Sequence, residues 1–104
     1  NYSSVLGGLI NTASSPYSFV GGGGSNAAQT AATGYNVVVG GANNIASGNY
    51  SFVGGGGDAV TATNRNTASG NYSIVVGGQL NTASGPYSFI SSGESNSAGG
   101  CWWF

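Results

Sequence analysis

The sequence predicts an all-β fold, a parallel β-solenoid of about seven coils with a repeat unit of 15 residues. Three observations lead to this prediction. Segments that begin with Tyr, such as "YSFVGGGG", recur along the chain, and their successive spacings are 15, 18, 15, 22 and 15. Val, Phe, Tyr and Thr favour strands, while the Gly pairs and Ser-Gly dipeptides mark corners. No window has helical periodicity with good helix formers, and a unit this short has room for one coil of a solenoid.

Each coil is expected to begin near its leading aromatic residue, with a strand at Tyr-Ser-Phe-Val. The seven starts are Tyr2, Tyr17, Tyr35, Tyr50, Tyr72, Tyr87 and Trp102. The closing "CWWF" continues the repeat because Trp102 follows Tyr87 at the same spacing as Tyr17 follows Tyr2. Its aromatic rings are interpreted either as a wider terminal coil that plugs the core or as a surface that stacks on a sugar. Residues 1–104 are interpreted as a single repeat domain, an excerpt of a longer fibre.

The position three residues after each Tyr is always β-branched, which predicts the core of the solenoid. This core column comprises Val5, Val20, Val38, Val53, Val75 and Ile90. Because side chains alternate along a strand, the Tyr and Phe residues take the opposite side. The expected aromatic interface comprises Phe19, Phe52, Phe89 and Trp102. This side is either covered by other chains or left open as a flat surface. Exposed aromatic columns favour an oligomer, and closed rotational symmetry favours a homotrimer.

A glycine corner follows the first strand, and the repeated "NTAS" segment predicts a second, shorter strand at Thr-Ala-Ser. An Asn column at this corner comprises Asn11, Asn44, Asn66, Asn81 and Asn96, with Gln29 expected to fill its gap. Side-chain amides stacked at the spacing of the coils bond along the ladder and stabilise it. Pro16 and Pro86 are expected at the start of the next strand, where a missing N–H is tolerated.

The Thr-Ala-Ser strand is expected to direct its Ala inward and its hydroxyls outward. Thr12, Thr67 and Thr82 form one outward column, interrupted by Ile45, beside a column of serines. Such a grid of hydroxyls either orders water and binds ice or a glycan, or is the ordinary polar surface of a solenoid.

Two insertions interrupt the period, within "SNAAQTAATG" and "DAVTATNRNTASG". They are expected to protrude on one side, since loops carried on rigid coils are where repeat proteins usually bind partners. Asp58 and Arg65 bracket the longer loop and are interpreted as at most a weak surface ion pair. The candidate contact residues are Asp58, Thr61, Thr63, Asn64, Arg65 and Gln29.

The composition argues against several classes of function. Lys and Arg together number one, which is too few to bind a nucleic-acid backbone. No His, Cys or carboxylate side chains cluster as metal ligands, and Asp58 and Glu94 lie far apart in the sequence, so we expect no enzyme activity and no cofactor. No segment is long and apolar enough to span a membrane. Cys101 is interpreted as a buried small residue, a free thiol or a link between chains.

The frame "VVGGxxNxASGxYSFVGGGG" is nearly whole from Val38 to Gly57 and begins again at Val75. It resembles the short repeats of trimeric autotransporter adhesin heads and of phage tail-fibre or bacterial surface-fibre shafts, over essentially the whole chain. The resemblance implies a trimeric β-solenoid at a cell surface or on a virion, with a surface glycan or host receptor as its partner. The repeat unit is slightly longer and more aromatic than adhesin head repeats usually are. The neck and anchor segments of adhesins are missing from these residues.

Together these features favour a non-enzymatic structural and adhesive module of an extracellular or virion surface fibre. The alternative is a monomeric ice- or glycan-binding solenoid that uses the Thr/Ser grid. A depolymerase tailspike would need an acidic cleft, for which a chain with two acidic residues offers little.

Overall fold

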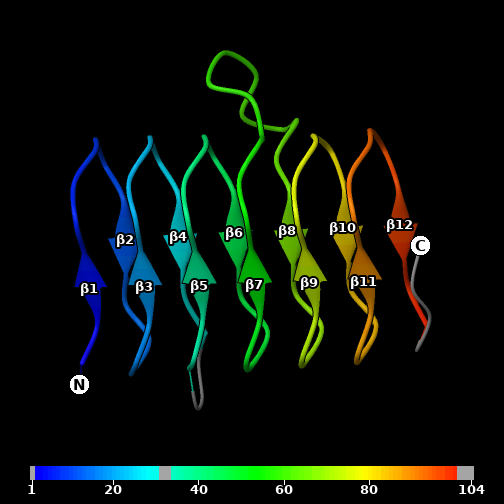
Figure 1. Ribbon diagram of the computed structural model, residues 1–104, viewed down its shortest axis with the longest axis horizontal. Helices are drawn as coiled ribbons and strands as arrows, with labels where there is room; N and C mark the ends of the chain where they lie inside the picture. Colours follow the sequence, from blue (N-terminus) through cyan, green and yellow to red (C-terminus); the bar gives the residue numbers. More distant parts are fainter. Residues whose placement is uncertain (1, 31–33, 101–104) are drawn as a thin grey trace.

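A computed structural model of the chain describes residues 2–30 and 34–100, and every regular element in these residues is a β-strand (Figure 1). Each coil contributes two short strands. The first strands are β1 (Ser4–Val5), β3 (Phe19–Val20), β5 (Val37–Val38), β7 (Phe52–Val53), β9 (Ile74–Val75) and β11 (Phe89–Ile90). The second strands are β2 (Thr12–Ala13), β4 (Ala27–Ala28), β6 (Ile45–Ala46), β8 (Thr67–Ala68), β10 (Thr82–Ala83) and β12 (Ser97–Ala98).

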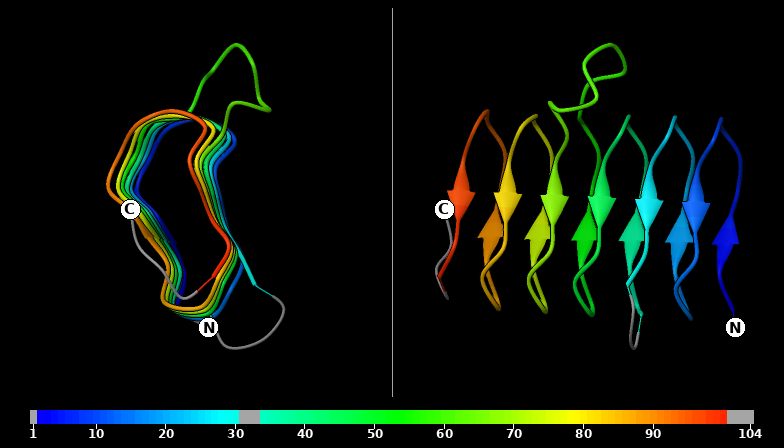
Figure 2. Two further views of the ribbon diagram at one scale, coloured as in Figure 1. Left: turned by 90° about the vertical axis from the view of Figure 1, so that its right-hand side faces the viewer. Right: turned by 180° about the vertical axis from the view of Figure 1, so that it is seen from behind.

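The strands form two parallel sheets that face each other across a thin slab. The odd-numbered strands make one six-stranded sheet and the even-numbered strands make the other. Each residue pairs with its counterpart one coil further on, as Val20 does with Val38. The principal extents are 31 × 30 × 16 Å. Viewed with the chain advancing from left to right, the odd strands run upward in the nearer layer and the even strands run downward behind them, so the coil is left-handed (Figures 1 and 2).

This architecture confirms the predicted all-β parallel solenoid. The described part of the chain contains six coils, each built from one odd and one even strand. The seventh copy of the repeat, expected from Trp102, lies in residues 101–104, outside the residues that the structure describes.

The first strand is two residues long in every described coil, and in four of the coils the Tyr lies in a turn instead of the strand. Positive φ angles between 59° and 61° occur at Tyr17, Tyr50, Tyr72 and Tyr87. In one such turn, Ser73 donates from its N–H and from its hydroxyl to the carbonyl oxygen of Gly70, at 3.2 and 2.6 Å. A positive φ at the third position is typical of a type II turn, whose second position favours Pro. Pro16 and Pro86 therefore lie in these turns, and the expectation that they start a strand is wrong.

The core consists of one large and one small column of side chains. Val20, Val38, Val53, Val75 and Ile90, from the odd strands, are all fully buried. They pack against buried alanines from the even strands, which are Ala28, Ala46, Ala68, Ala83 and Ala98. A β-branched residue opposite Ala allows the two sheets to approach closely, in keeping with the thin slab. Val5, the remaining member of the predicted core column, is 44% exposed because the first coil packs against a neighbouring coil on one side only.

A ladder of asparagines joins the coils at the corner between an odd strand and the following even strand. Oδ1 of Asn44 accepts a hydrogen bond from the backbone N–H of Asn66 at 3.1 Å. Its Nδ2 donates to the carbonyl oxygens of Gly40 in its own coil and of Gly56 in the next coil, at 3.0 and 2.9 Å. The members of the ladder are Asn11, Asn26, Asn44, Asn66, Asn81 and Asn96. The four buried amides of this ladder, those of Asn26, Asn44, Asn66 and Asn81, are thus fully paired, and the predicted Asn column is confirmed.

Gln29 is not part of this asparagine ladder, and the expectation that it fills the gap is wrong. Asn26 takes the position, and its N–H donates to Oδ1 of Asn11 at 2.9 Å. Asn26 follows Asn11 at the regular period, because the extra residues of this coil come later in the chain. Gln29 instead follows β4, in the outward column that contains Ser14 and Ser47.

Replacing Asn66 with Ala is expected to destabilise the solenoid strongly. The change removes the side-chain partner of the carbonyl oxygen of Gly55 and of the N–H of Asn81, and one of the two donors to the carbonyl oxygen of Gly78, which keeps the N–H of Gly57. Each buried polar group that loses its partner costs roughly 1–3 kcal/mol. We expect the free energy of unfolding, measured in urea, to fall by about 3 kcal/mol or more.

The matched control for this change is Asn71→Ala. Asn71 is exposed, and its side chain accepts one hydrogen bond, from the N–H of Asn49 at 3.1 Å. Water can replace that partner, so the control should cost under about 1 kcal/mol. Equal losses in the two variants would contradict the role assigned to the asparagine ladder.

Candidate interaction surfaces

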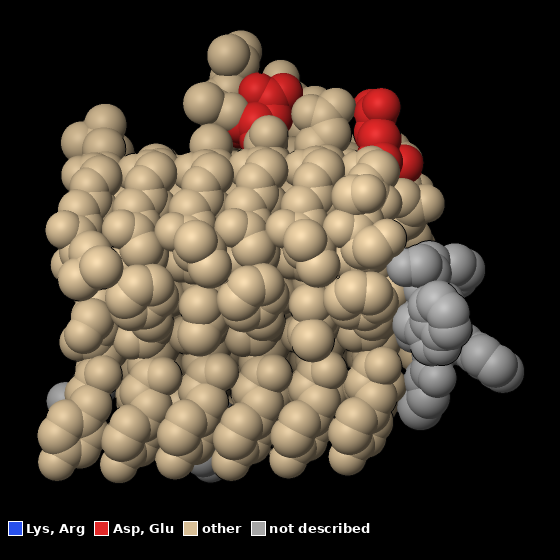
Figure 3. Space-filling view, viewed as in Figure 1, with Lys and Arg blue, Asp and Glu red and all other residues tan. Residues whose placement is uncertain are grey.

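The outward side of the odd strands forms a broad uncharged surface, which we call the apolar face. Its central column is Ser4, Phe19, Val37, Phe52, Ile74 and Phe89, half-buried except for the exposed Ser4. Two residues further along their coils, Leu6, Val39 and Val76 are exposed on the same side. Figure 3 looks onto this face and shows acidic side chains only along its upper margin. The predicted Phe residues therefore share one surface, whereas Trp102 lies outside the described residues.

Large and small side chains alternate from coil to coil and keep the apolar face level. Phe19 is followed two residues later by Gly21, and Phe52 by Gly54, while the coils with a smaller central residue carry Val or Leu there. A Cβ placed at either Gly would clash with a carbonyl oxygen of the next coil, that of Val39 or Val76, and would lie 3.4 Å from Cε1 of the Phe in its own coil. The neighbouring backbone therefore excludes a side chain there, and the Phe ring lies beside the glycine. A level apolar surface of this kind suits contact with another flat surface.

A tyrosine ladder runs along the corner at the edge of the apolar face. Its members are Tyr2, Tyr17, Tyr35, Tyr50, Tyr72 and Tyr87, with ring centroids 4.8–5.2 Å apart from one coil to the next. These tyrosine residues are 40–74% exposed. Neighbouring rings cover both faces of each inner ring, so the ladder presents ring edges and hydroxyls to solvent.

The outward side of the even strands is the hydroxyl face, and its Thr column is more interrupted than expected. The column is Thr12, Ala27, Ile45, Thr67, Thr82 and Ser97. Ala27 pairs with Ile45, so the only neighbouring threonines of the column are Thr67 and Thr82. The outward direction of the hydroxyls agrees with the prediction, but the grid is regular over two adjacent coils only.

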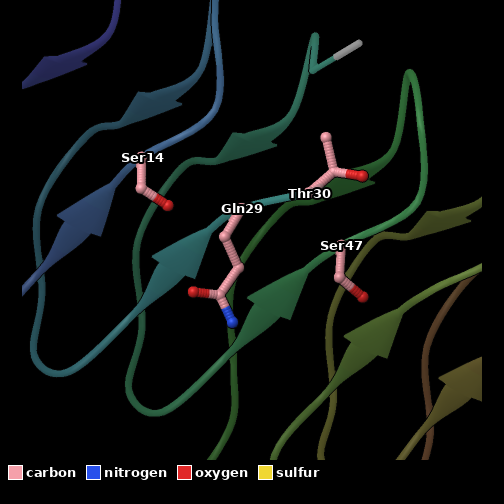
Figure 4. A pocket seen from close by; sticks show the side chains of 4 residues that line it. All are labelled: Ser14, Gln29, Thr30 and Ser47. Carbon is pink, nitrogen blue, oxygen red and sulfur yellow. The ribbon is translucent and has the colours of Figure 1, made fainter. Parts of the chain in front are cut away.

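A shallow hollow of about 390 Å³ lies beside this face, lined by Ser14, Gln29, Thr30 and Ser47 (Figure 4). Gln29 occupies the position equivalent to Ser14 and Ser47 in the coil between them, and its longer side chain extends between the two serines. All four side chains are neutral donors and acceptors. The hollow therefore offers hydrogen bonds to a small polar molecule and no charge.

Residues 58–64 form a loop that projects beyond the corner between β7 and β8 (Figure 2). Oδ1 of Asp58 accepts hydrogen bonds from the N–H groups of Val60 and Thr61, at 2.8 and 3.2 Å. Its Oδ2 accepts from Nδ2 of Asn64 at 3.3 Å, and the N–H of Asn64 donates to the carbonyl oxygen of Thr61 at 2.9 Å. The structure thus brings the predicted Asp58, Thr61 and Asn64 together, with the exposed Thr63 in the same loop.

Asp58 and Arg65, which directly follows the loop, both bond to groups of the loop. Nε of Arg65 donates to the carbonyl oxygen of Ala62 at 2.9 Å, and Asp58 is held by the three donors described above, so the weak ion pair considered from the sequence is not formed. The hydrogen bonds from Val60, Thr61 and Asn64, in that order of size, lower the pKa of Asp58 from its ordinary value of 3.8.

The connections that carry the two insertions lie at opposite edges of the slab, so the expectation that both protrude on one side is wrong. The shorter insertion falls between β4 and β5, whereas the longer one falls between β7 and β8. A connection from an even to an odd strand runs along one edge of the slab, and a connection from an odd to an even strand runs along the other (Figure 2). Gln29 is therefore at a different corner from the loop that contains Asp58.

Within residues 2–30 and 34–100, no group of three or more His, Cys, Asp or Glu side chains is placed to hold a metal ion. The same residues include no helix of the length and apolar character needed to cross a membrane.

Comparisons of the chain with protein-family models, curated proteins and solved structures found no match. The apolar face, the hydroxyl face and the loop of residues 58–64 are therefore the features on which a functional proposal depends.

The loop of residues 58–64 is expected to loosen in acid. Because the folded pKa of Asp58 lies below 3.8, its ionised form stabilises the loop above that value, and this contribution is lost as the pH falls through the folded pKa. NMR signals of the Val60 and Thr61 amides should move toward random-coil positions over that range. Asp58→Ala should show the loosened positions already at neutral pH, and Glu94→Gln should leave them unchanged. If the chemical shifts of these amides change neither on acidification nor on replacement of Asp58, the role assigned to Asp58 is contradicted.

Proposed function

We propose that this chain is a non-enzymatic structural and adhesive module of an extracellular or virion surface fibre, and that it assembles as a homotrimer through its apolar face. The single observation that carries the proposal is the uncharged outward side of the odd strands, where a half-buried apolar column lies beside the exposed Leu6, Val39 and Val76. On that side lie Phe19, Phe52 and Phe89 with Val39 and Val76. Such contiguous apolar surfaces on soluble proteins mark interaction sites.

The size of the apolar face supports an interface between chains. The two larger extents of the slab, 31 and 30 Å, bound a face on the order of 900 Å². Each partner in a standard-size protein interface buries roughly 800 Å². Closed rotational symmetry about an axis parallel to the solenoid axis places equivalent coils of all copies at the same height along that axis. Three copies related in this way can cover one another's apolar faces and so shield them from water.

The projecting loop is the proposed contact with a host receptor or surface glycan. Its position at a corner keeps it away from the centre of the apolar face, so that assembly leaves it accessible (Figure 2). Asp58 holds its shape, and Thr61, Thr63 and Arg65 supply polar groups on a rigid coil. Loops placed in this way on a scaffold commonly carry recognition.

The alternative function, ice or glycan binding by a monomer, would use the hydroxyl face. The neighbouring Thr67 and Thr82 favour it, while Ala27 and Ile45 interrupt the regular spacing that a repeating ligand needs. This balance favours the fibre module.

Replacing Phe19, Phe52 and Phe89 together with Ser is expected to dissociate the oligomer. Light scattering of the unmodified chain in reducing buffer should give three times the chain mass of 10.1 kDa. Burial of aromatic side chains dominates most interfaces, so loss of the three rings should weaken association by about a hundredfold or more. Circular dichroism should show that the outward substitutions leave the solenoid folded.

The matched control replaces Thr12, Thr67 and Thr82 with Ser on the opposite sheet, and it should leave the mass unchanged. A clean monomer at every concentration would overturn the proposed assembly. In that case, thermal hysteresis that is lost in the Thr variant would establish the alternative function.

A further inference from the structure

The tyrosine ladder places reactive rings in fixed contact along the chain. From Tyr17 to Tyr87, successive ring centroids are 4.8–5.0 Å apart and the ring planes lie within 5° of parallel. The backbone holds this spacing, since the N–H of Tyr72 donates to the carbonyl oxygen of Asn49 at 2.8 Å. Groups held together in this way react with effective molarities far above any concentration of free chains.

The same rings are accessible and have few competitors for an oxidant. Every tyrosine residue of the ladder is at least 40% exposed. The sequence contains no Met and no His, and its one Cys and two Trp all fall in residues 101–103. The six tyrosines are therefore the main oxidisable side chains of the solenoid.

We propose that the tyrosine ladder is a site of oxidative cross-linking, at which a one-electron oxidant couples neighbouring rings to dityrosine. A haem peroxidase with hydrogen peroxide is the class of oxidant that fits. Each of two phenols loses one electron and one proton, and the two phenoxyl radicals form a C–C bond between ring carbons ortho to oxygen. The hydrogen on each of these carbons then returns to its oxygen. One hydrogen peroxide takes up both electrons and both protons and leaves as two water molecules.

The fold allows this reaction without breaking the coil. The outer edges of the rings are in solvent, so two rings can tilt until their ortho carbons meet while the backbone stays hydrogen-bonded. A bond between Tyr35 and Tyr50 would join two successive coils and close a loop of one repeat unit. Such a link restricts the unfolded chain, so the cross-linked solenoid should unfold at a higher denaturant concentration. The inference does not depend on the proposed oligomer.

Two triple variants with the same number of tyrosines test the proposal. Tyr2→Phe, Tyr17→Phe and Tyr87→Phe together leave Tyr35, Tyr50 and Tyr72 as neighbours. Tyr17→Phe, Tyr50→Phe and Tyr87→Phe together leave Tyr2, Tyr35 and Tyr72, each two coils apart. Tyr→Phe keeps the stacked ring and removes only an exposed hydroxyl, so both variants should fold. The dilute proteins are treated with horseradish peroxidase and hydrogen peroxide. Dityrosine fluorescence and the loss of two hydrogens per link are then measured on the fraction of single-chain mass.

The unmodified chain and the variant with neighbouring tyrosines should form dityrosine within one chain, at a yield about tenfold or more above that of the alternating variant. Peptide mapping should find the links between successive coils. Equal single-chain yields in the two variants, or links only between different chains, would overturn the proposal. The mass of the untreated protein tests the trimer separately, so failure of either idea leaves the other measurable.

Discussion

The asparagine ladder fixes the register between coils, and the other columns of side chains depend on it. Each strand is only two residues long, so the sheets alone provide few backbone hydrogen bonds per coil. At Asn44, the side chain reaches a carbonyl oxygen in its own coil and another in the next coil, and it also accepts an N–H from the next coil. A slip of one residue would leave these buried groups without partners, at a cost of roughly 1–3 kcal/mol each. The ladder therefore selects one register out of the many that short strands allow.

Register turns sequence columns into surfaces with different chemistry. The core needs only one side of each strand, because Val from one sheet fills the space left by Ala from the other. The outward positions are free to vary, and on the even strands they are Thr, Ser, Ala or Ile. The folding of a single coil thus does not require Phe and Val on the outward side of the odd strands. The proposed assembly through the apolar face would account for their presence.

Spacing in the sequence predicts the coil and its core because both depend on a fixed period. The Val column and most of the Asn column follow directly from the constant offset between successive coils. Spacing does not show where a corner lies within the coil. Tyr favours strands, so nothing in its residue type indicates that Tyr72 adopts a φ of 61° in a turn. For the same reason, spacing did not show that the connections carrying the two insertions lie at opposite edges of the slab. Asn26 is a different case, because it follows Asn11 at the regular offset, and this offset was the signal in the sequence that Asn26, and not Gln29, continues the asparagine ladder.

The longer insertion shows how the solenoid separates its loops from its register. Nδ2 of Asn66 bonds to the carbonyl oxygen of Gly55, eleven residues earlier, where Asn44 uses Gly40, four residues earlier. Both amides reach the carbonyl oxygen of the following coil in the same way, at 2.8 and 2.9 Å. The extra residues thus form a loop between the carbonyl oxygen of Gly55 and the amide of Asn66, which keep the same relative position as the equivalent groups of other coils. A corner of this kind accepts additional residues while the apolar face, the tyrosine ladder and the core keep their alignment, because the asparagine on the far side of the loop restores the coil.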